Sequence, residues 1–516
     1  MRFTKSLSLA AISAAVLALL APVRILATKH PKYGGTLRVE LHVASVSLDP
    51  REWKIGSVAA ADNEKLAALV YDRLVTLDDY GRFQPALATE WSHDTTSKNW
   101  QFKLRPGVKF SDGSALTPKD VSAALQPLLP TGVQISSTEN GIQIRAARAT
   151  PDLLELLASG RYFVFRVQPD GTLLGTGPFI LAENSSATPS EANPSALKPA
   201  HLSFRANDDA WAGRPFVDAI DVTLGEPALR QILDLQVGRA DLIDIPPDLV
   251  RKARQENMRV WSSPPDTLLA LRFDDAQPAT SDPRLREALD SALDRETMAN
   301  VLLQRQALPA SALLPQWLSG YAFLFGTPMN LDHAKELRSA LPANFVGGIE
   351  PLRLRVDAVG DLMKLLGERV AVNARQANIS IQPVSSHSAS IAGSTTTTSP
   401  GAGLHLFAWH YDSLSPRVEL EALAQHLHSE AGAEAIAESG DPEKLYADER
   451  RLLDERQVLP LVLLPEYVGI APSVRNWTAA PSGEWRLADV WLESGEPAAS
   501  NTEPATGRNA ASGVHP

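Results

Sequence analysis

The sequence predicts a mixed α/β fold, because strand-like and helix-like patterns of apolar residues alternate along the chain. Residues 100–105 alternate large apolar and polar side chains, which is the period-two pattern of a half-buried strand. Asn140-Gly141 stands between two apolar runs, residues 133–135 and 142–144, and predicts a β-hairpin. Residues 282–293 carry apolar side chains at helical spacing. Strands and helices are therefore expected in the same globule.

A second short strand is expected directly after the first. Pro106-Gly107 and Asp112-Gly113 are both typical turn pairs, and residues 108–110 lie between them. The alternation of apolar and polar residues continues through this short run. The turn pairs therefore predict two consecutive strands.

Two helices are predicted from their start signals. Thr117 is a good N-cap, Pro118 suits the first helical position, and Asp120 stands where a capping-box acid stands. Residues 150–151, Thr-Pro, start a Leu-rich helix that is expected to close near Gly160.

Two later helices are distinguished by their faces. Asp282-Pro283 caps the first of them. The acid-rich helix over residues 443–454 is interpreted as a solvated face with Glu-to-Arg pairs. The apolar residues on one face of the first helix are Leu285, Ala288, Leu289, Ala292 and Leu293.

The N-terminus has the pattern of a secretory signal peptide over residues 1–27. Arg2 and Lys5 precede a hydrophobic run over residues 7–21, and a small residue follows at position 27. The alternative is an uncleaved membrane anchor, which is disfavoured because Arg24 interrupts the apolar run and the span is short. Export from the cytoplasm is therefore expected.

Charge and cysteine content narrow the function classes. The 516 residues include 49 basic and 60 acidic ones, and the signal segment removes three basic residues and no acids, leaving a net charge of −14. Such an acidic chain is a poor candidate for nucleic-acid binding, which needs clustered Lys and Arg. The absence of cysteine excludes disulfides, thiolate metal sites, a cysteine nucleophile and a lipoprotein anchor. The chain is therefore expected to diffuse freely in the periplasm.

Three biased segments interrupt the chain. Residues 183–199 are rich in Ser, Ala and Pro, and residues 385–403 include four consecutive threonines. Both are predicted to be surface loops. Residues 494–516 have no periodicity and are predicted to form a disordered tail.

Several motifs in order resemble the family 5 extracellular solute-binding proteins of ABC transporters, the peptide- and nickel-binding group. The family has a Leu-Ala-x-x-Trp segment, a Phe-x-Leu-Arg-x-Gly-Val-x-Phe-x-Asp-Gly strand pair and a Thr-x-x-Asp-Val helix start. It also has a Gly-Thr-Gly-Pro-Tyr/Phe turn and an Asp-x-Arg-x-Arg-x-Ala-Leu helix. The matching segments here are residues 87–91, 102–113, 117–121, 175–179 and 282–289. The resemblance covers nearly everything from residue 33 to residue 493.

The resemblance implies a three-lobed, periplasmic-binding-protein-like α/β fold, with two large lobes, a hinge and a small inserted lobe. Lobe I would comprise residues 30–60, 174–268 and 478–493. Lobe II would be the insertion 61–173. Lobe III would be 269–477.

The resemblance also implies a ligand site at residues 407–412, Phe-Ala-Trp-His-Tyr-Asp. This segment is similar to the family's Gly-Trp-x-x-Asp-Tyr-Pro, whose aspartate pairs with the ligand's α-ammonium in peptide-binding members. On this chain that residue is Asp412, with Trp409 as a wall of the pocket and His410 placed to reach the cleft. A desolvated carboxylate and an aromatic face are suited to a primary ammonium. The alternative is that Trp409 is a core residue and Asp412 a turn acid.

The same region departs from the family pattern in three respects. Ser413 stands where the family has an aromatic residue, and residues 404–407 offer no arginine for a peptide carboxylate. The stretch between residues 121 and 175 is shorter than in oligopeptide-binding relatives. These differences do not match a full oligopeptide pocket.

Asn63 completes the candidate ligand-binding residues, and no metal site is expected. Asn63 matches the family only in position and could equally belong to the first turn of a helix leading to Leu74. His405 and His410 are five apart, which places them on opposite faces of a continuous strand. No metal-binding motif occurs, so neither a protein-held metal nor another cofactor is expected. A metal chelate stays open as a ligand.

The sequence therefore predicts the substrate-binding component of an ABC importer. It would be a monomer that captures a short peptide or another amine-bearing solute and delivers it to membrane permease subunits. One alternative is a degenerate member with a non-transport binding role. The other is a periplasmic hydrolase, although no Gly-x-Ser-x-Gly, Walker A or Gly-x-Gly-x-x-Gly motif occurs and an enzyme is not expected.

Overall fold

The computed structural model describes residues 30–78, 80–185, 188–189, 197–198, 200–273, 280–326, 329–341, 351–356, 361–385, 403–437, 441–480 and 483–493. The predicted signal peptide and C-terminal tail lie outside these residues, as do most of the two Ser-rich segments. Residues 1–32 and 33–516 form separate units, and the second is described here. Among the described residues no helix combines the length and apolarity needed to cross a membrane.

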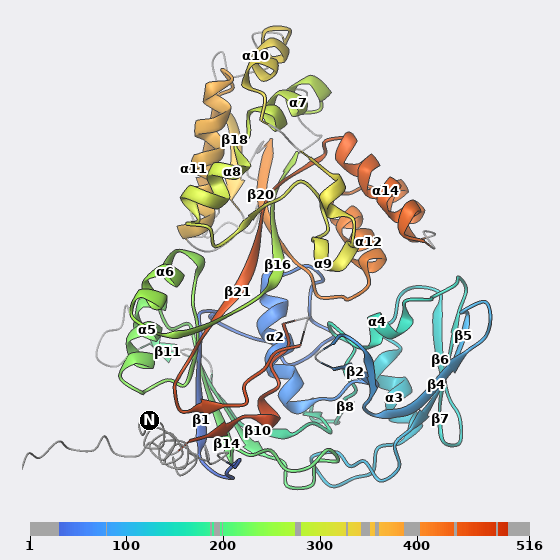
Figure 1. Cartoon of the computed structure of the whole chain (residues 1–516). Helices are drawn as coiled ribbons and strands as arrows, with labels where there is room; N and C mark the ends of the chain where they lie inside the picture. The colour runs from blue at the N-terminus through green and yellow to red at the C-terminus, as the bar shows by residue number, and fades with distance from the viewer. Residues whose placement is uncertain are drawn as a thin grey trace, which may run out of the picture. The chain divides into compact units, whose positions relative to one another are not determined.

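One mixed sheet of eleven strands organises the second unit (Figure 1). Its central strands β14, β1 and β15 are parallel to one another, and so are β20, β18 and β19. The remaining pairs are antiparallel. The strands in spatial order are β10 (Phe179–Ser185), β13 (Ala200–Ala206), β14 (Ala219–Leu224), β1 (Thr36–Leu41), β15 (Leu242–Asp244), β21 (Val458–Ile470), β16 (Arg259–Phe273), β20 (Leu404–His410), β18 (Leu352–Val356) and β19 (Ile381–Ser385), with β17 (Leu308–Pro309) beside β21.

The two longest strands, β16 and β21, pass from one half of this sheet to the other (Figure 1). One end of β21 pairs with β15, and one end of β16 pairs with β20. Their mutual register is irregular between Ser262 and Thr267, where Pro264 and Pro265 supply no N–H to the ladder. The chain is therefore least regular at the crossing between the two halves.

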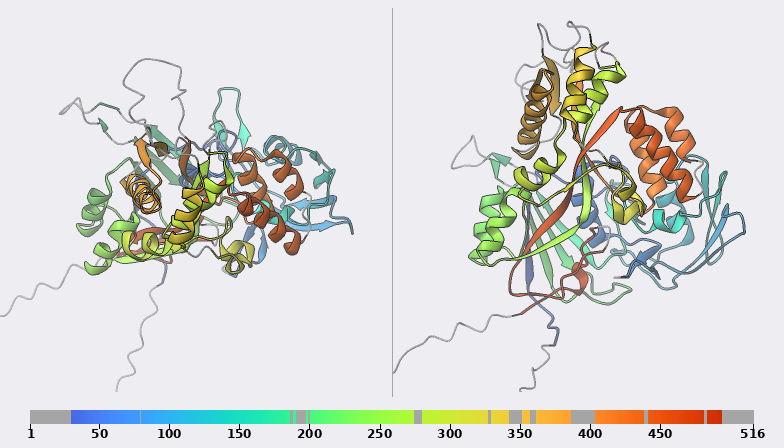
Figure 2. Two further views of the ribbon diagram at one scale, coloured as in Figure 1. Left: turned by 90° about the horizontal axis from the view of Figure 1, so that it is seen from above. Right: turned by 45° about the horizontal axis from the view of Figure 1, so that its top comes forward.

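Separate hydrophobic cores lie on either side of that crossing. Tyr467 and Val468 of β21 belong to the core built around β1 and β14, whereas Leu459 and Leu461 belong to a second core. Leu268 and Ala270 of β16 face a third core on the opposite side of the strands. Helices α7 and α11 cover the second core and α12, α13 and α14 the third, on opposite sides of β16 and β21 (Figure 2).

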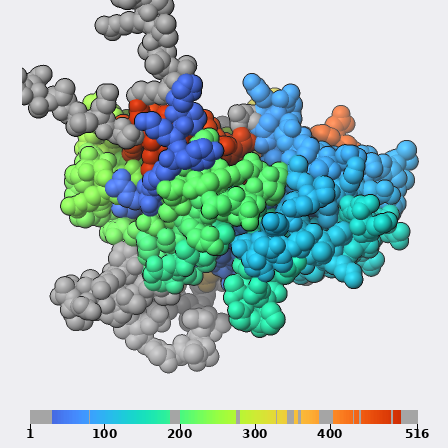
Figure 3. Space-filling model, turned by 90° about the horizontal axis from the view of Figure 1, so that it is seen from below, coloured from blue at the N-terminus to red at the C-terminus, as the bar shows by residue number. Residues whose placement is uncertain are grey.

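A four-stranded antiparallel sheet packs into the first core with helix α3. Its strands appear blue to cyan beside the green strands β13 and β14 on the face shown in Figure 3. In spatial order they are β4 (Ala88–His93), β5 (Asn99–Leu104), β7 (Gly141–Ala146) and β6 (Val133–Ser137). The two-stranded sheets are β2 (Val75–Leu77) with β3 (Phe83–Pro85), β8 (Arg166–Val167) with β9 (Leu173–Leu174), β11 (Thr188–Pro189) with β12 (Leu197–Lys198), and β22 (Val474–Arg475) with β23 (Trp491–Leu492).

Helices connect these strands and cover their faces. The described helices are α2 (Val58–Val70), α3 (Pro118–Leu125), α4 (Leu153–Leu157), α5 (Ala228–Gln236), α6 (Pro247–Gln255), α7 (Pro283–Ala292), α8 (Arg295–Thr297), α9 (Gln316–Ser319), α10 (Leu331–Ser339), α11 (Asp361–Gln376), α12 (Pro416–His426), α13 (Glu430–Ala437) and α14 (Pro442–Asp454). A π-helix, η1 (Met298–Leu302), and two 3-10 helices, η2 (Ala322–Leu324) and η5 (Leu487–Asp489), complete them.

The predicted mixed α/β fold is confirmed, together with most of its local signals. β5 and the β6–β7 hairpin form where the patterns predict them. Thr117 and Asp120 form the expected capping box at the start of α3, and Asp282 caps α7. The short strand expected at residues 108–110 is wrong: only an isolated bridge between Lys109 and Ala115 forms. The run between two turns is too short for a ladder and folds back on the residues after it.

Two helix predictions need correction. The Leu-rich helix begins at Leu153 rather than at residues 150–151, because the hydroxyl of Thr150 donates to Ser97 O and the chain turns once more before the helix. α14 is not merely a solvated face, since Glu449 is fully buried and its Oε1 accepts from Leu313 N at 2.6 Å. Its surface ion pairs are Asp–Arg rather than Glu–Arg.

Candidate ligand-binding site

Asp412 lies in the short loop that connects β20 to α12. Just before it, Tyr411 N donates to Asp266 O at 2.9 Å, which anchors the loop to β16. Just after it, Ser415 Oγ accepts from Val418 N at 3.2 Å and caps α12. Because the loop is anchored at both ends, a strand and a helix together set the position of the Asp412 carboxyl group.

Two glycines from distant segments pack against this loop. Gly56 O accepts from His410 N at 3.0 Å, and Gly56 N donates to the carboxyl group of Asp412. A β-carbon on Gly56 would lie 2.4 Å from the ring of Trp409, and one on Gly160 would lie 2.6 Å from Asp412 O. Both glycines have positive φ, at +74° and +54°. Larger residues are therefore excluded by contact and by backbone conformation.

The structure brings Trp409, His410 and Asp412 together at the end of β20. Trp409 is buried and its Nε1 donates to Glu419 at 3.1 Å. It therefore packs as a core residue, as the alternative interpretation of the sequence expects, and it also supports the loop. The buried ring of His410 has Nδ1 3.4 Å from Thr267 Oγ1. Asp412 is only partly buried.

Asn63 lies on α2 and has a different local partner. Its Oδ1 accepts from Ser47 N at 2.9 Å, which ties α2 to the loop that precedes it. The next residue, Glu64, is the one whose ionisation is affected by the charge of Asp412. The local contacts therefore give Asn63 a structural partner, and its predicted contact with ligand stays a prediction.

The environment of Asp412 disfavours its charged form. Burial raises the pKa of the carboxyl group above its usual value, while His410, a hydrogen bond from Glu419, the N–H of Gly56 and the charge of Arg161 act in the opposite direction. A carboxylate in such a place gains stability from any cation that reaches it.

A buried ion-pair network lies next to this group. Arg73 Nη2 is 2.5 Å from Glu64 Oε1 and 2.8 Å from Gly160 O, and Arg73 Nη1 pairs with Glu484. Its guanidinium stacks 3.8 Å from the ring centroid of Phe163. Arg73 thus links α2, the segment after α4 and the C-terminal segment around the candidate site.

A second buried cluster surrounds Lys65 on α2. Lys65 Nζ is 3.0 Å from Asp62 and 2.6 Å from Glu466, and lies 5.1 Å from the ring centroid of Trp485. Burial lowers the pKa of Lys65, but the nearby carboxylates outweigh it and hold the pKa well above its ordinary value. Since Glu466 belongs to β21, this cluster ties α2 to the crossing between the two halves of the sheet.

The sequence did not single out Gly56, Arg161 or Glu419, and it singled out Gly160 only as the expected end of a helix. The only signal for the glycines is the residue type, because their partners lie hundreds of residues away. Glu419 stands in an ordinary first turn of a helix, where acids are common. Its role depends on the three-dimensional contacts with Trp409.

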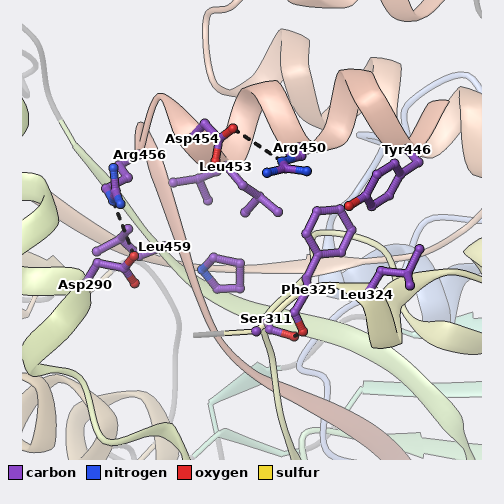
Figure 4. A pocket seen from close by; sticks show the side chains of 13 residues that line it. Asp290, Ser311, Leu324, Phe325, Tyr446, Arg450, Leu453, Asp454, Arg456 and Leu459 are labelled. Carbon is purple, nitrogen blue, oxygen red and sulfur yellow. Dashed lines mark hydrogen bonds and ion pairs between the residues drawn. The ribbon is translucent and has the colours of Figure 1, made fainter. Parts of the chain in front are cut away.

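Two cavities occur away from this loop. One of about 260 Å³ lies beside α14 and is lined by Phe325, Tyr446 and two acid–base pairs, Arg450 with Asp454 and Arg456 with Asp290 (Figure 4). The other, of about 440 Å³, lies over β4, β5 and β7 of the four-stranded sheet. Neither is lined by Asp412. In the part of the chain that the structure describes, no three His, Cys, Asp or Glu side chains form a metal-binding group.

Comparisons with known proteins agree with this fold. The family model of the bacterial extracellular solute-binding proteins, family 5 Middle, matches residues 82–426. The chain is 24% identical to the nickel-binding protein NikA of Staphylococcus aureus, over 67% of this chain and 69% of that protein. It is 26% identical to a probable di/tripeptide-binding protein of Pseudomonas aeruginosa, over 50% of this chain and 55% of that one.

A solved structure shows the same fold. The ABC transporter substrate-binding protein CtaP of Listeria monocytogenes superposes with a TM-score of 0.72 at 17% identity, covering 89% of this chain and 100% of that one. Family membership supports a substrate-binding role in import, and members of this family act outside the cytoplasm. The chain belongs to family 5 of the bacterial extracellular solute-binding proteins.

Proposed function

We propose that this protein is the substrate-binding component of an ABC importer and captures a small amine-bearing solute, such as a short peptide. The carrying observation is the position of Asp412: its carboxyl group accepts from Gly56 N, its backbone packs against Gly160, and Gly56 in turn packs against the ring of Trp409. Burial raises the pKa of this carboxyl group although His410 and Arg161 favour its charged form, so the carboxylate lacks a full positive counter-charge. A ligand ammonium supplies that charge.

The recognition chemistry follows from these groups. An ammonium next to Asp412 forms charge-assisted hydrogen bonds with the carboxylate in a partly desolvated place. The aromatic face of Trp409 adds apolar contact and attraction to the cation. Asn63 and His410 are proposed as further ligand contacts.

Capture is proposed to proceed by hinge closure between lobes I and III, with the boundaries expected from the sequence. β16 and β21 connect the two halves, and their register is irregular at Pro264 and Pro265. A ligand that contacts both lobes stabilises the closed state by its differential affinity. The proposed hinge lies at this irregular crossing, which separates the core around β1 and β14 from the cores of the other half of the sheet.

The proposal also covers the location and the partners of the protein. The expected signal peptide would be cleaved and leaves no lipid anchor, so we propose that the protein is periplasmic. We further propose that it is a monomer that delivers its ligand to ABC permease subunits. It acts as a binding protein rather than as a hydrolase. A nickel chelate is the second ligand class, because His410 and Asp412 are adjacent in space and a curated relative is a nickel-binding protein.

Titration calorimetry with trialanine and N-acetyl-trialanine tests this function. Trialanine should bind to the wild-type protein, while N-acetylation or Asp412→Asn should weaken binding at least tenfold, because either change removes one member of the ion pair. Asp332→Asn, an exposed aspartate on α10, is the matched control and should bind as the wild type does.

Two further arms separate the alternatives. Nickel with excess histidine tests the chelate class, and small-angle scattering tests whether ligand compacts the protein. Equal binding of acetylated and free tripeptide would contradict the role of Asp412. No binding of any peptide or chelate would favour the degenerate member.

A further inference from the structure

Glu419 is a buried acid in the first turn of α12, directly behind the candidate site. Its side chain is 1% exposed. Burying a carboxyl group costs free energy unless donors or a cation compensate it. Its contacts therefore indicate what the group does.

Those contacts lie on both sides of Asp412 in the sequence. Glu419 Oε1 accepts from Ser413 N at 2.5 Å, and Glu419 Oε2 accepts from Trp409 Nε1 at 3.1 Å. Glu419 is also hydrogen-bonded to Asp412 itself. One carboxyl group thus holds the indole wall, the loop backbone and the proposed binding carboxylate.

Two carboxyl groups in hydrogen-bond contact cannot both stay ionised at low cost. Burial raises the pKa of Glu419 well above its ordinary value, and the charge of Asp412 adds to that shift. The groups around the two carboxyl groups include both positively and negatively charged side chains. The titratable and charged groups that face the pair are His410 and Tyr411 from β20 and its loop, Arg161 and Tyr162 from the segment after α4, and Glu64 from α2.

We propose that Glu419 is the positioning residue of the ligand site and that it shares one proton with Asp412 in the ligand-free protein. The proton lies between the two carboxyl groups, so the pair carries a single negative charge. A ligand ammonium then meets one carboxylate that is oriented and hydrogen-bonded in place. This inference rests on the proposed role of Asp412 in ligand binding.

Infrared difference spectroscopy on the ligand-free protein tests the shared proton. A protonated carboxyl group has a C=O stretch that an ionised one lacks. At neutral pH, Glu419→Gln should remove one protonated-carboxyl band from the wild-type spectrum, and Asp412→Asn should shift that same band, because the hydrogen-bond partner of the proton changes while burial still favours protonated Glu419. Glu421→Gln, on the same helix and paired with Arg417 at 3.2 Å, is the matched control and should leave that band unchanged.

The two substitutions act by different routes, which keeps the test valid if one variant fails to fold. Glu419→Gln removes the acid that carries the proton, and Asp412→Asn replaces the carboxyl group that shares it. An unchanged band in either folded variant overturns the shared proton. A band lost equally in Glu421→Gln overturns its assignment to this pair.

Trialanine binding tests the positioning role separately. Glu419→Gln should weaken binding about tenfold and make it less dependent on pH, because the glutamine amide cannot accept from both N–H donors and does not titrate. Unchanged affinity and an unchanged pH profile overturn the positioning role. If the wild type itself does not bind trialanine, the proposed function fails while the spectroscopic result still decides the shared proton.

Discussion

Two acid clusters flank α2, and they differ in the groups that compensate their carboxylates. At the first, Lys65 Nζ lies 3.0 Å and 2.6 Å from two carboxylates and 5.1 Å from the ring centroid of Trp485. At the second, two carboxyl groups and a tryptophan also meet, and Asp412 is stabilised by His410, by a hydrogen bond from Glu419, by the N–H of Gly56 and by the charge of Arg161 rather than by a lysine. The first cluster shows how this protein holds an ammonium. The second has the same kinds of group with the place of the ammonium left to a ligand.

The largest predicted effect is to remove the internal ammonium. Lys65→Met should lower the free energy of unfolding by about 3–5 kcal/mol, because it leaves buried carboxylates without their cation. Urea denaturation measures the change. Lys335→Met, on the exposed side of α10, should change it by less than about 0.5 kcal/mol.

Adding Glu466→Gln to Lys65→Met should recover part of that loss, since it removes one of the stranded charges. A loss of unfolding free energy below about 1 kcal/mol in Lys65→Met alone would mean that ion pairs do not stabilise the Lys65 cluster. That cluster could then no longer serve as the model for an ammonium bound at Asp412.

A third buried acid extends the comparison to a carboxyl group that is compensated by neutral hydrogen-bond donors. Burial raises the pKa of Glu449 from 4.5 to about 7, against the N–H groups of Leu313 and Leu314 and the hydroxyl of Tyr321. Since the folded state holds this proton more tightly than the unfolded state, the stability is full below about pH 4.5 and is lost as the pH rises towards 7.

Relative to Glu449→Gln, the wild type should therefore lose about 2–3 kcal/mol of unfolding free energy between pH 4.5 and pH 8. Urea denaturation across this pH range measures the difference. Glu443→Gln, at the exposed start of α14, should follow the wild-type profile. Parallel profiles for the wild type and Glu449→Gln would show that the acid stays ionised on its N–H donors alone.

The smallest predicted effect is a gain in stability rather than a loss. Asp412→Asn should raise the melting temperature of the ligand-free protein, with a gain of about 1 kcal/mol, because it removes one of two facing carboxyl groups. Asp241→Asn should instead be destabilising, since Asp241 is paired with Arg38 at 2.8 Å. A loss of stability in Asp412→Asn would mean that the site is already fully compensated.

The sequence predicted the fold better than it predicted the site, and the reason is the range of the interactions. The capping box of Thr117 and Asp120 is read from residues three apart, and the structure confirms it. The segment after β20 was found by resemblance. The burial of Glu449 could not be predicted, because its donors lie more than 130 residues away.

The contacts within the site could not be predicted from the sequence for a similar reason, since they depend on the three-dimensional fold. Gly56 is required because the ring of Trp409 occupies the space of a side chain there, a contact between residues far apart in the sequence. Glu419 looks like an ordinary first-turn acid until its contacts with Trp409 and Ser413 are known. The family resemblance predicted a cation site at Asp412, and the three-dimensional contacts show which groups surround that residue.

The central claim is that Asp412 is the receptor for a ligand ammonium, as Asp62 and Glu466 are for Lys65. A crystal structure of the protein with bound trialanine tests it most directly. The account predicts the peptide's terminal nitrogen within about 2.7–3.2 Å of an Asp412 carboxyl oxygen, next to the indole of Trp409. A terminal nitrogen bound elsewhere, with Asp412 still bonded only to Gly56 and Glu419, would contradict it.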